Sequence, residues 1–241
     1  MSDKINVSAV SYTNTKPFVY GLTHSPVASH INLSLDIPAT CADKLLNNEV
    51  DLGLVPVATL LHMPQYELVS DYCIGAVGAV NSVFIFSTKP IEEIQSICFD
   101  AQSRTSNLLA QVLMKHLWKK EVQWLSEGQA DAFVEIGDRT FGKKAQYAYS
   151  YDLSECWFSL TQLPFVFAAW VSVVKLPQHF LSLFNEALAF GINNRNELIE
   201  SLAKENLAID LRHYLTQSID YQFDSQKRLG LSRFLELAST L

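Results

Sequence analysis

The sequence Val50-Asp-Leu-Gly-Leu-Val-Pro-Val57 is an almost unbroken apolar run that ends at a proline. Such runs are typical of strands buried on both faces of a parallel sheet, and proline suits the first turn of a following helix. Two shorter strand-like runs, at 5–10 and 31–36, precede it, and each is followed by a helix-start signal. Residues 1–65 therefore predict the order β-α-β-α-β, the beginning of an α/β fold.

A second α/β run begins near Lys89, after strand-like segments that no helix separates. In this run we predict a helix at 105–118 and strands at 97–100, 122–125 and 132–136. After a strand-like run at 165–174, the apolar positions recur at helical spacing. The rest of the chain is therefore expected to be helical.

These patterns predict two lobes joined by two crossings of the chain. The first crossing is expected at 84–88 and the return at 165–169. Lobe one then contains residues 1–87 and 169–241, with the C-terminal helices, and lobe two contains residues 88–168. The two crossing strands form a hinge. A cleft between two lobes is a usual place for a small ligand, and lobe motion excludes water from it.

The charge balance argues against a polyanionic partner. Lys and Arg total 18 against 25 Asp and Glu, a net charge of −7. We therefore expect no nucleic-acid partner, and a small anionic ligand has to be held by local donors. No apolar run approaches the roughly 20 residues that span a bilayer, and the N-terminal residues lack a signal-peptide pattern. The protein is expected in the cytoplasm, without a membrane partner, as a monomer or homodimer.

The cysteines and histidines form no disulfide or metal-ligand pattern. Four cysteines lie far apart beside apolar residues and are expected to be reduced, buried thiols: Cys41, Cys73, Cys98 and Cys156. The six histidines show no ligand spacing, so no metal site is expected. Glycine-rich nucleotide motifs and the nucleophile-elbow motif are also missing, which disfavours nucleotide binding and serine hydrolysis.

The segment Asp100-Ala-Gln-Ser-Arg-Thr-Ser106 is the strongest candidate for a binding site. It lies between a predicted strand and a predicted helix, so backbone N–H groups, hydroxyls and one guanidinium meet at a helix N-terminus. That combination suits a carboxylate, held by Ser103, Arg104, Thr105 and Ser106. The alternative is a plain N-cap, where Ser or Thr is expected regardless of function.

Three other loops supply candidate residues, each with an open alternative. Asn14 and Lys16 follow the first strand and are expected to face the cleft, although Asn is equally common in a solvated turn. Gly78 lets the backbone approach a ligand and Ser82 is a donor, but both also fit a loosened edge strand. Asp138 either caps the next segment or binds a ligand hydroxyl.

Five motifs, in order, resemble the chorismate dehydratase family of the futalosine route to menaquinone: Val10-Ser-Tyr12-x-Asn14-Thr-Lys-Pro17, Asp51-Leu-Gly-Leu-Val-Pro-Val57, Cys73-Ile74 with Gly78 and Ser82-Val83, Ser103-Arg-Thr-Ser106, and Ile136-Gly-Asp138. The motifs cover residues 5–138, and the helical C-terminal part adds little. The resemblance implies a periplasmic-binding-protein-like type II fold, which agrees with two lobes. Two departures stand out: Thr13 replaces a usually apolar residue, and Glu135 and Arg139 add charge beside the last motif.

The resemblance implies a hydro-lyase that eliminates water from chorismate to give 3-[(1-carboxyvinyl)oxy]benzoate, without cofactor or metal. Asn14 would be catalytic by orienting the substrate's own second carboxylate as the base, and Ser82 by holding the enolpyruvyl end. The implied substrate-binding residues are Tyr12, Lys16, Gly78, Ser103, Arg104, Thr105, Ser106 and Asp138. Two alternatives stay open: a lyase like 1,4-dihydroxy-6-naphthoate synthase, and a non-catalytic cytoplasmic sensor of small carboxylates.

Overall fold

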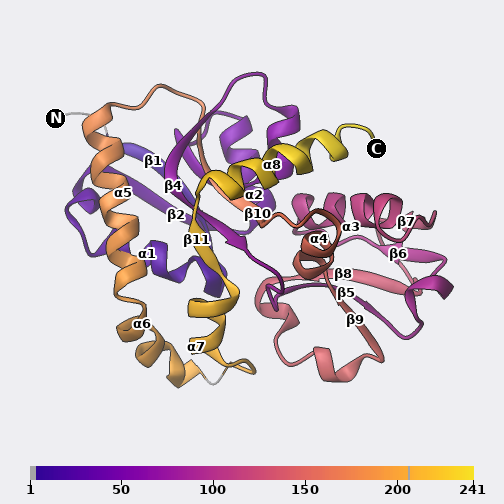
Figure 1. Cartoon of the computed structure of the whole chain (residues 1–241). Helices are drawn as coiled ribbons and strands as arrows, with labels where there is room; N and C mark the ends of the chain where they lie inside the picture. Colours follow the sequence, from indigo (N-terminus) through magenta and orange to yellow (C-terminus); the bar gives the residue numbers. More distant parts are fainter. Residues whose placement is uncertain (1–3, 206) are drawn as a thin grey trace.

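The computed structural model describes residues 4–205 and 207–241, and it has two lobes, each built on one β-sheet (Figure 1). Lobe one has a six-stranded sheet in the order β11-β4-β10-β3-β1-β2. Its strands are β1 (Ile5–Val10), β2 (Ile31–Asp36), β3 (Leu52–Pro56), β4 (Glu67–Ala76), β10 (Phe165–Ser172) and β11 (Asp220–Gln222). β1 is parallel to β2 and β3, whereas β10 is antiparallel to β3 and β4. Every residue of β3 is buried, as its apolar sequence predicts.

Lobe two has a five-stranded sheet in the order β7-β6-β8-β5-β9. Its strands are β5 (Val83–Ser87), β6 (Ser96–Cys98), β7 (Gln123–Leu125), β8 (Ala132–Ile136) and β9 (Tyr149–Asp152). β6 is parallel to β7 and β8, and β5 is antiparallel to β8 and β9. The predicted two-lobed α/β class is confirmed.

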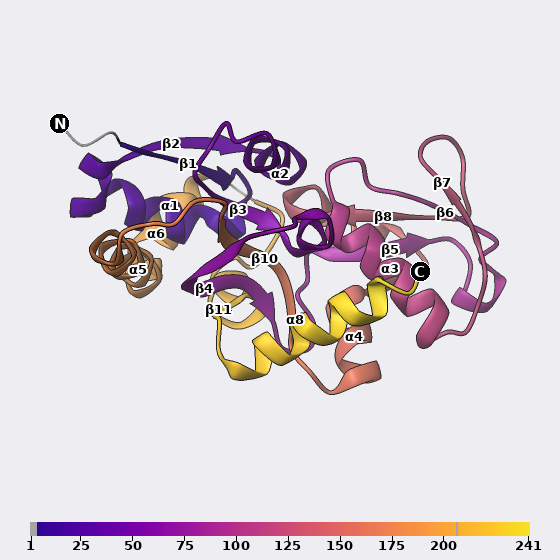
Figure 2. The ribbon, with the colours of Figure 1, turned by 90° about the horizontal axis from the view of Figure 1, so that it is seen from above.

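Helices pack against both sheets (Figures 1 and 2). They are α1 (Lys16–Thr23), α2 (Pro38–Leu46), α3 (Arg104–His116), α4 (Leu153–Thr161), α5 (Gln178–Asn193), α6 (Arg195–Leu202), α7 (Leu211–His213) and α8 (Ser225–Ala238). α7 continues directly into a π-helical turn, Tyr214–Ser218. Short 3₁₀ turns at Thr13–Thr15 and Gly137–Thr140 precede α1 and follow β8.

Helices α1 and α5 approach each other closely enough to exclude side chains at two positions. A Cβ atom on Gly21 would lie 1.9 Å from the Ala187 carbonyl oxygen, and one on Gly191 would lie 1.9 Å from the Pro17 carbonyl oxygen. Pro17 stands in the first turn of α1. The contact therefore fixes the start of α1 and the candidate loop at 11–16 before it.

The chain crosses between the lobes in loops at 77–82 and 162–164, not within strands. β5, which was expected in lobe one, pairs with β8 and β9 of lobe two, and all of β10 belongs to the sheet of lobe one. The extended run after β4 ends because Gly78 and Asn81 have φ angles of 76° and 60°, values outside the β region. The sheets therefore place the lobe boundaries at these two loops, and not at 87/88 and 168/169.

Helix α8 contacts both lobes, whereas the sequence predicted that it stays on lobe one (Figure 2). It packs on β10 of lobe one and on α3 of lobe two. Just beyond α8, the Thr240 carbonyl accepts a hydrogen bond from Lys115 Nζ at 2.7 Å. An apolar stripe on a helix shows that the helix is covered but does not show by which lobe.

The prediction of four reduced, buried thiols is confirmed only in part. The four cysteines are free, with Cys41 and Cys73 buried but Cys98 and Cys156 only half-buried. Within 4–205 and 207–241, no helix combines the length and the apolar character needed to cross a membrane.

Candidate active site

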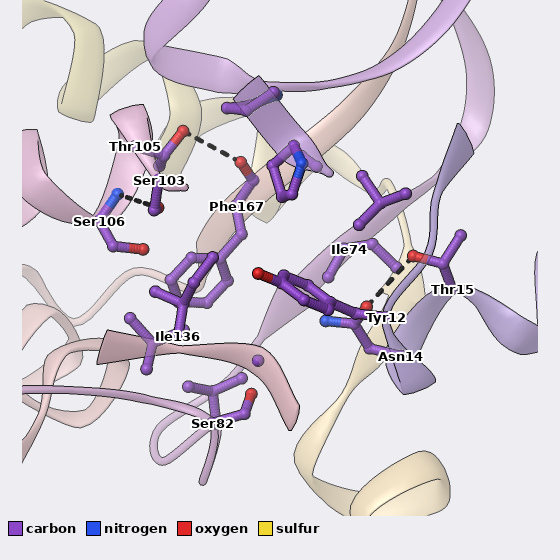
Figure 3. A pocket seen from close by; sticks show the side chains of 17 residues that line it. Tyr12, Asn14, Thr15, Ile74, Ser82, Ser103, Thr105, Ser106, Ile136 and Phe167 are labelled. Carbon is purple, nitrogen blue, oxygen red and sulfur yellow. Dashed lines mark hydrogen bonds between the residues drawn. The ribbon is translucent and has the colours of Figure 1, made fainter. Parts of the chain in front are cut away.

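A pocket lies between the lobes, where the loop before α1 faces the N-terminus of α3 (Figure 3). Its cavity volume is about 60 Å³, below the roughly 300–1,000 Å³ usual for small-ligand sites. Its polar lining residues are Tyr12, Asn14, Thr15, Ser82, Ser103, Thr105 and Ser106, and its apolar ones include Val10, Pro56, Ile74, Val80, Ile136 and Phe167. Six of the ten residues predicted for the site therefore line one pocket.

The N-terminus of α3 presents hydrogen-bond donors to this pocket. Ser103 is the N-cap, and its hydroxyl oxygen accepts from the Ser106 backbone N–H at 3.1 Å. The Ser106 side chain is buried, and in the described part of the chain its hydroxyl has no hydrogen-bond partner. The first N–H groups of any helix also have no partner within that helix. The segment is thus an N-cap and, at the same time, a set of unused donors.

Thr105 has a structural role that the sequence did not reveal. Its hydroxyl donates to the Phe167 carbonyl and accepts from the Ala58 backbone N–H, both at 3.2 Å. The Phe167 carbonyl belongs to β10, at an irregularity in the pairing with β4. Thr105 therefore ties α3 of lobe two to two elements of lobe one at the edge of the pocket.

The two predicted cationic ligands lie outside the pocket. Arg104 Nη2 forms an ion pair with Asp43 Oδ1 at 2.5 Å, and Lys16 Nζ forms one with Glu205 Oε2 at 2.9 Å. Both pairs are partly exposed, so each contributes little to stability. Neither cation is among the lining residues.

Gly78 and Asp138 also lie outside the pocket lining. Gly78 is in the crossing loop, and the space where its Cβ would stand is open. The Asp138 carboxylate accepts from the Thr13 backbone N–H at 3.1 Å and from its hydroxyl at 2.9 Å. Burial raises the pKa of Asp138, and the hydrogen bonds from Thr13 partly offset that effect. Thr13, the departure from the family pattern, is thus half of a contact between the lobes.

Tyr12 closes the pocket on the side of lobe two. Its phenol donates to the Gln102 side chain, and its ring lies against Gly137. A Cβ at Gly137 would stand 2.8 Å from the Tyr12 ring, and Gly137 has a φ of 66°. Only glycine therefore fits at the start of this turn without displacing Tyr12.

The second departure from the family pattern, the charged pair Glu135 and Arg139, forms ion pairs with residues close in space. Glu135 Oε1 forms an ion pair with Lys143 Nζ at 2.6 Å, and Arg139 Nη2 forms one with Asp100 Oδ2 at 2.5 Å. Asp100 Oδ2 also accepts from the Ile136 backbone N–H at 3.0 Å. These ion pairs join residues within lobe two, so none of these charges lies in the pocket lining.

Two oxygen atoms of Asn14 accept hydrogen bonds. Its Oδ1 accepts from the Thr15 hydroxyl at 3.1 Å, and its backbone carbonyl accepts from the Tyr221 phenol at 2.8 Å. With Oδ1 occupied, the Asn14 NH₂ group is the end left to donate. The structure therefore favours a pocket residue over the solvated-turn alternative for Asn14.

Ser82 hydrogen-bonds with Tyr214, a residue that the sequence did not predict for the site. The Tyr214 phenol donates to Ser82 Oγ at 2.9 Å, and both side chains are buried. Burial raises the pKa of Tyr214 far above its usual value, and hydrogen bonding with Ser82 and Asn14 offsets only part of that. Tyr214 lies in the helical C-terminal part, where one tyrosine among apolar residues carries no sequence signal.

The pocket lining contains no charged side chain among the described residues. Figure 3 shows Ser103, Thr105 and Ser106 on one side and Asn14 and Thr15 on the other, with the Tyr12 ring between them. Carboxylates here would be held by hydroxyls, an amide and helix N–H groups, in a mostly apolar space. Such neutral, oriented donors stabilise negative charge strongly where water is excluded.

A two-lobed α/β chain with a ligand pocket between its lobes defines the class of periplasmic-binding-protein-like folds, and solved structures agree. A protein from Archaeoglobus fulgidus matches with a TM-score of 0.77 at 16% identity, covering 99% of this chain and 98% of that one. A Candida albicans protein, described as having the generic periplasmic binding protein fold, gives 0.70 at 11% identity over 99% and 90% of the two chains. The periplasmic aliphatic sulphonate binding protein of Escherichia coli gives 0.64 at 14% identity over 100% and 93%. At these identities the likeness establishes the fold.

The sequence itself gives the family. A sequence family described as menaquinone biosynthesis matches residues 5–240, and the chain belongs to it. A chorismate dehydratase from Thermus thermophilus is 28% identical over 259 residues, covering 92% of this chain and 95% of that protein. The family resemblance drawn from the five motifs is confirmed.

Proposed function

We propose that this chain is a chorismate dehydratase, a hydro-lyase that converts chorismate to 3-[(1-carboxyvinyl)oxy]benzoate. The proposal is carried by the neutral donor pocket at the α3 N-terminus, found in a member of the menaquinone biosynthesis family. The Thermus thermophilus relative supports the choice of substrate. Chorismate has two carboxylates joined by an apolar ring and ether, which suits donors on opposite sides of an apolar pocket.

The reaction removes a proton and a hydroxide from adjacent ring carbons. The proton on the carbon that bears the enolpyruvyl ether is acidic because the negative charge left on that carbon is delocalised through the adjacent ring double bond to the ring carboxylate. When its C–H bond breaks, the electron pair moves through the ring toward that carboxylate. The C–O bond to the neighbouring hydroxyl then breaks, the leaving hydroxide takes the proton that the base removed and departs as water, and the ring becomes aromatic.

The donors at the α3 N-terminus stabilise the charge of that step. Negative charge grows on the ring carboxylate, and the hydroxyl of Ser106 and the first backbone N–H groups of α3 are placed to bind it. A preorganised donor set contributes most when charge develops during the reaction, not before it. The ring carboxylate therefore binds at this end of the pocket, against Ser103 and Ser106.

The base in this proposal is the second carboxylate of the substrate. Among the described lining residues there is no His, Asp, Glu or Lys to accept the proton. Asn14 orients the enolpyruvyl carboxylate and the leaving hydroxyl, and Ser82 holds the enolpyruvyl end. If Asn14→Ala leaves turnover unchanged, or Asn14→Asp raises it, the role given to Asn14 is wrong.

The test is to mix the purified protein with chorismate and follow the product by ultraviolet absorbance and mass. We expect an aromatic product lighter than chorismate by one water. Chorismate that binds but stays intact would instead support the sensor. Turnover of a futalosine-derived intermediate, with none of chorismate, would support the other lyase. Cytoplasmic location and a monomeric or homodimeric state stay predictions from the sequence.

A further inference from the structure

We propose that Tyr214 is a positioning residue for the dehydration, fixing Ser82 beside Asn14. The inference rests on the proposed function, since it concerns the two side chains to which that function gives roles. Tyr214 does not line the pocket itself. It borders another cavity, which Asn81, Phe141 and Ser218 also line.

The hydrogen bond from Tyr214 determines what Ser82 can do. A serine hydroxyl has one proton to donate and two lone pairs with which to accept. Because burial raises the pKa of Tyr214, the phenol keeps its proton over the whole working pH range. Tyr214 gives this proton to Ser82 Oγ at 2.9 Å. The proton of Ser82 is then free to point into the pocket, toward a carboxylate.

The same phenol lies close to Asn14. Thr15 occupies the Asn14 Oδ1 atom, and the Asn14 side chain lowers the pKa of Tyr214 against the larger effect of burial. The amide NH₂ group is the end of Asn14 left to donate. Tyr214 thus stands beside both side chains that the proposal places on the enolpyruvyl half of the substrate, and it holds Ser82 directly.

The π-helical turn at Tyr214–Ser218 holds Tyr214 in this position. Its far end is tied to the crossing loop, since Asn81 Nδ2 donates to Ser218 Oγ at 3.1 Å. Arg195 Nη1 donates to the Leu215 carbonyl at 3.0 Å. The Tyr214 ring packs edge-on against Phe141, with 5.3 Å between ring centroids. π-helical turns of this kind often occur at functional sites, and these anchors keep the phenol directed at Ser82.

The test is a double-mutant cycle of Tyr214→Phe and Ser82→Ala, read out as kcat and as the Kd for chorismate. In the wild-type background we expect Tyr214→Phe to lower kcat about 10- to 100-fold, because Ser82 loses its fixed partner. In the Ser82→Ala background the same change should lower kcat, or weaken binding where kcat is too low to measure, by about threefold or less. The matched control is Tyr151→Phe, which removes a phenol oxygen that accepts from the Ile91 backbone N–H at 2.8 Å in lobe two, away from the pocket.

The outcomes separate this inference from the proposed function. If the wild-type protein does not turn over chorismate, the proposed function fails and this inference fails with it. If the wild-type protein is active but Tyr214→Phe matches Tyr151→Phe, only the role of Tyr214 is wrong. An equal fold-loss in both Ser82 backgrounds would mean that Tyr214 merely supports the fold, which also overturns the inference.

Discussion

Replacing Thr105 by valine should loosen the junction of the two lobes, although valine has nearly the same shape. The substitution removes the only hydroxyl between the Ala58 backbone N–H and the Phe167 carbonyl in the described structure, and both groups are buried. Each buried group left without a partner costs about 1–3 kcal/mol. Because two groups lose their partner, we expect a loss of about 2–6 kcal/mol in the free energy of unfolding. For a chain of this size that corresponds to a fall in Tm of roughly 4–24 °C.

The measurement is urea unfolding followed by tryptophan fluorescence, with Thr105→Ser as the matched control. Serine keeps the hydroxyl and loses only a buried methyl group, so it should stay within about 1 kcal/mol of the wild type. If valine and serine are equally stable, or if serine is the worse of the two, the hydroxyl does not join the lobes as described. In that case the role of Thr105 would be confined to the ligand.

Three further predictions concern other parts of the site. Gly137→Ala should weaken chorismate binding at least about tenfold by titration calorimetry, because the new Cβ would stand 2.8 Å from the Tyr12 ring and displace it; unchanged affinity would show that Tyr12 does not shape the pocket. Burial raises the pKa of Asp152 to about 6, so the folded state holds this proton after the unfolded chain has released it near pH 4. The free energy of unfolding should then fall as pH rises from about 4 to 6, by on the order of 3 kcal/mol, and level off above; Asp152→Asn should flatten that slope in urea titrations, and a slope that persists would assign it to other groups. Finally, Ser106→Ala should lower kcat/KM about 10- to 100-fold, whereas Arg104→Ala should change it less than about twofold; the reverse order would return the carboxylate to the arginine.

The sequence predicted those parts of the fold that depend on local pattern. The apolar run at 50–57 became β3, and the strand expected at 132–136 has those limits in the structure. Which strands pair with each other was harder to predict, because the apolar residues of 83–87 would suit either sheet. The chain leaves lobe one through a loop in which Gly78 and Asn81 have positive φ angles; both residue types favour such a turn, but neither shows which sheet the next strand joins.

In the candidate site, the kinds of side chain that line the pocket were predicted better than the directions in which individual side chains point. Hydroxyls and amides predicted for the pocket do line it, but Arg104 and Lys16 turn outward to Asp43 and Glu205. A helix N-terminus places successive side chains around its axis, so adjacent residues cannot all face one ligand. Tyr214 could not be predicted, since its role depends on meeting residues far away in the sequence.

The strand order of lobe one has a consequence for how the protein is made. The sheet of lobe two comes from one continuous stretch, 83–152, so it can form as soon as that stretch has left the ribosome. The sheet of lobe one begins with β1 but needs β10 between β3 and β4, and β11 at its edge. Domains tend to fold as units during synthesis. The lobe that is synthesised first is therefore the one completed last, and until β10 arrives the inner edges of β3 and β4 remain open to wrong partners.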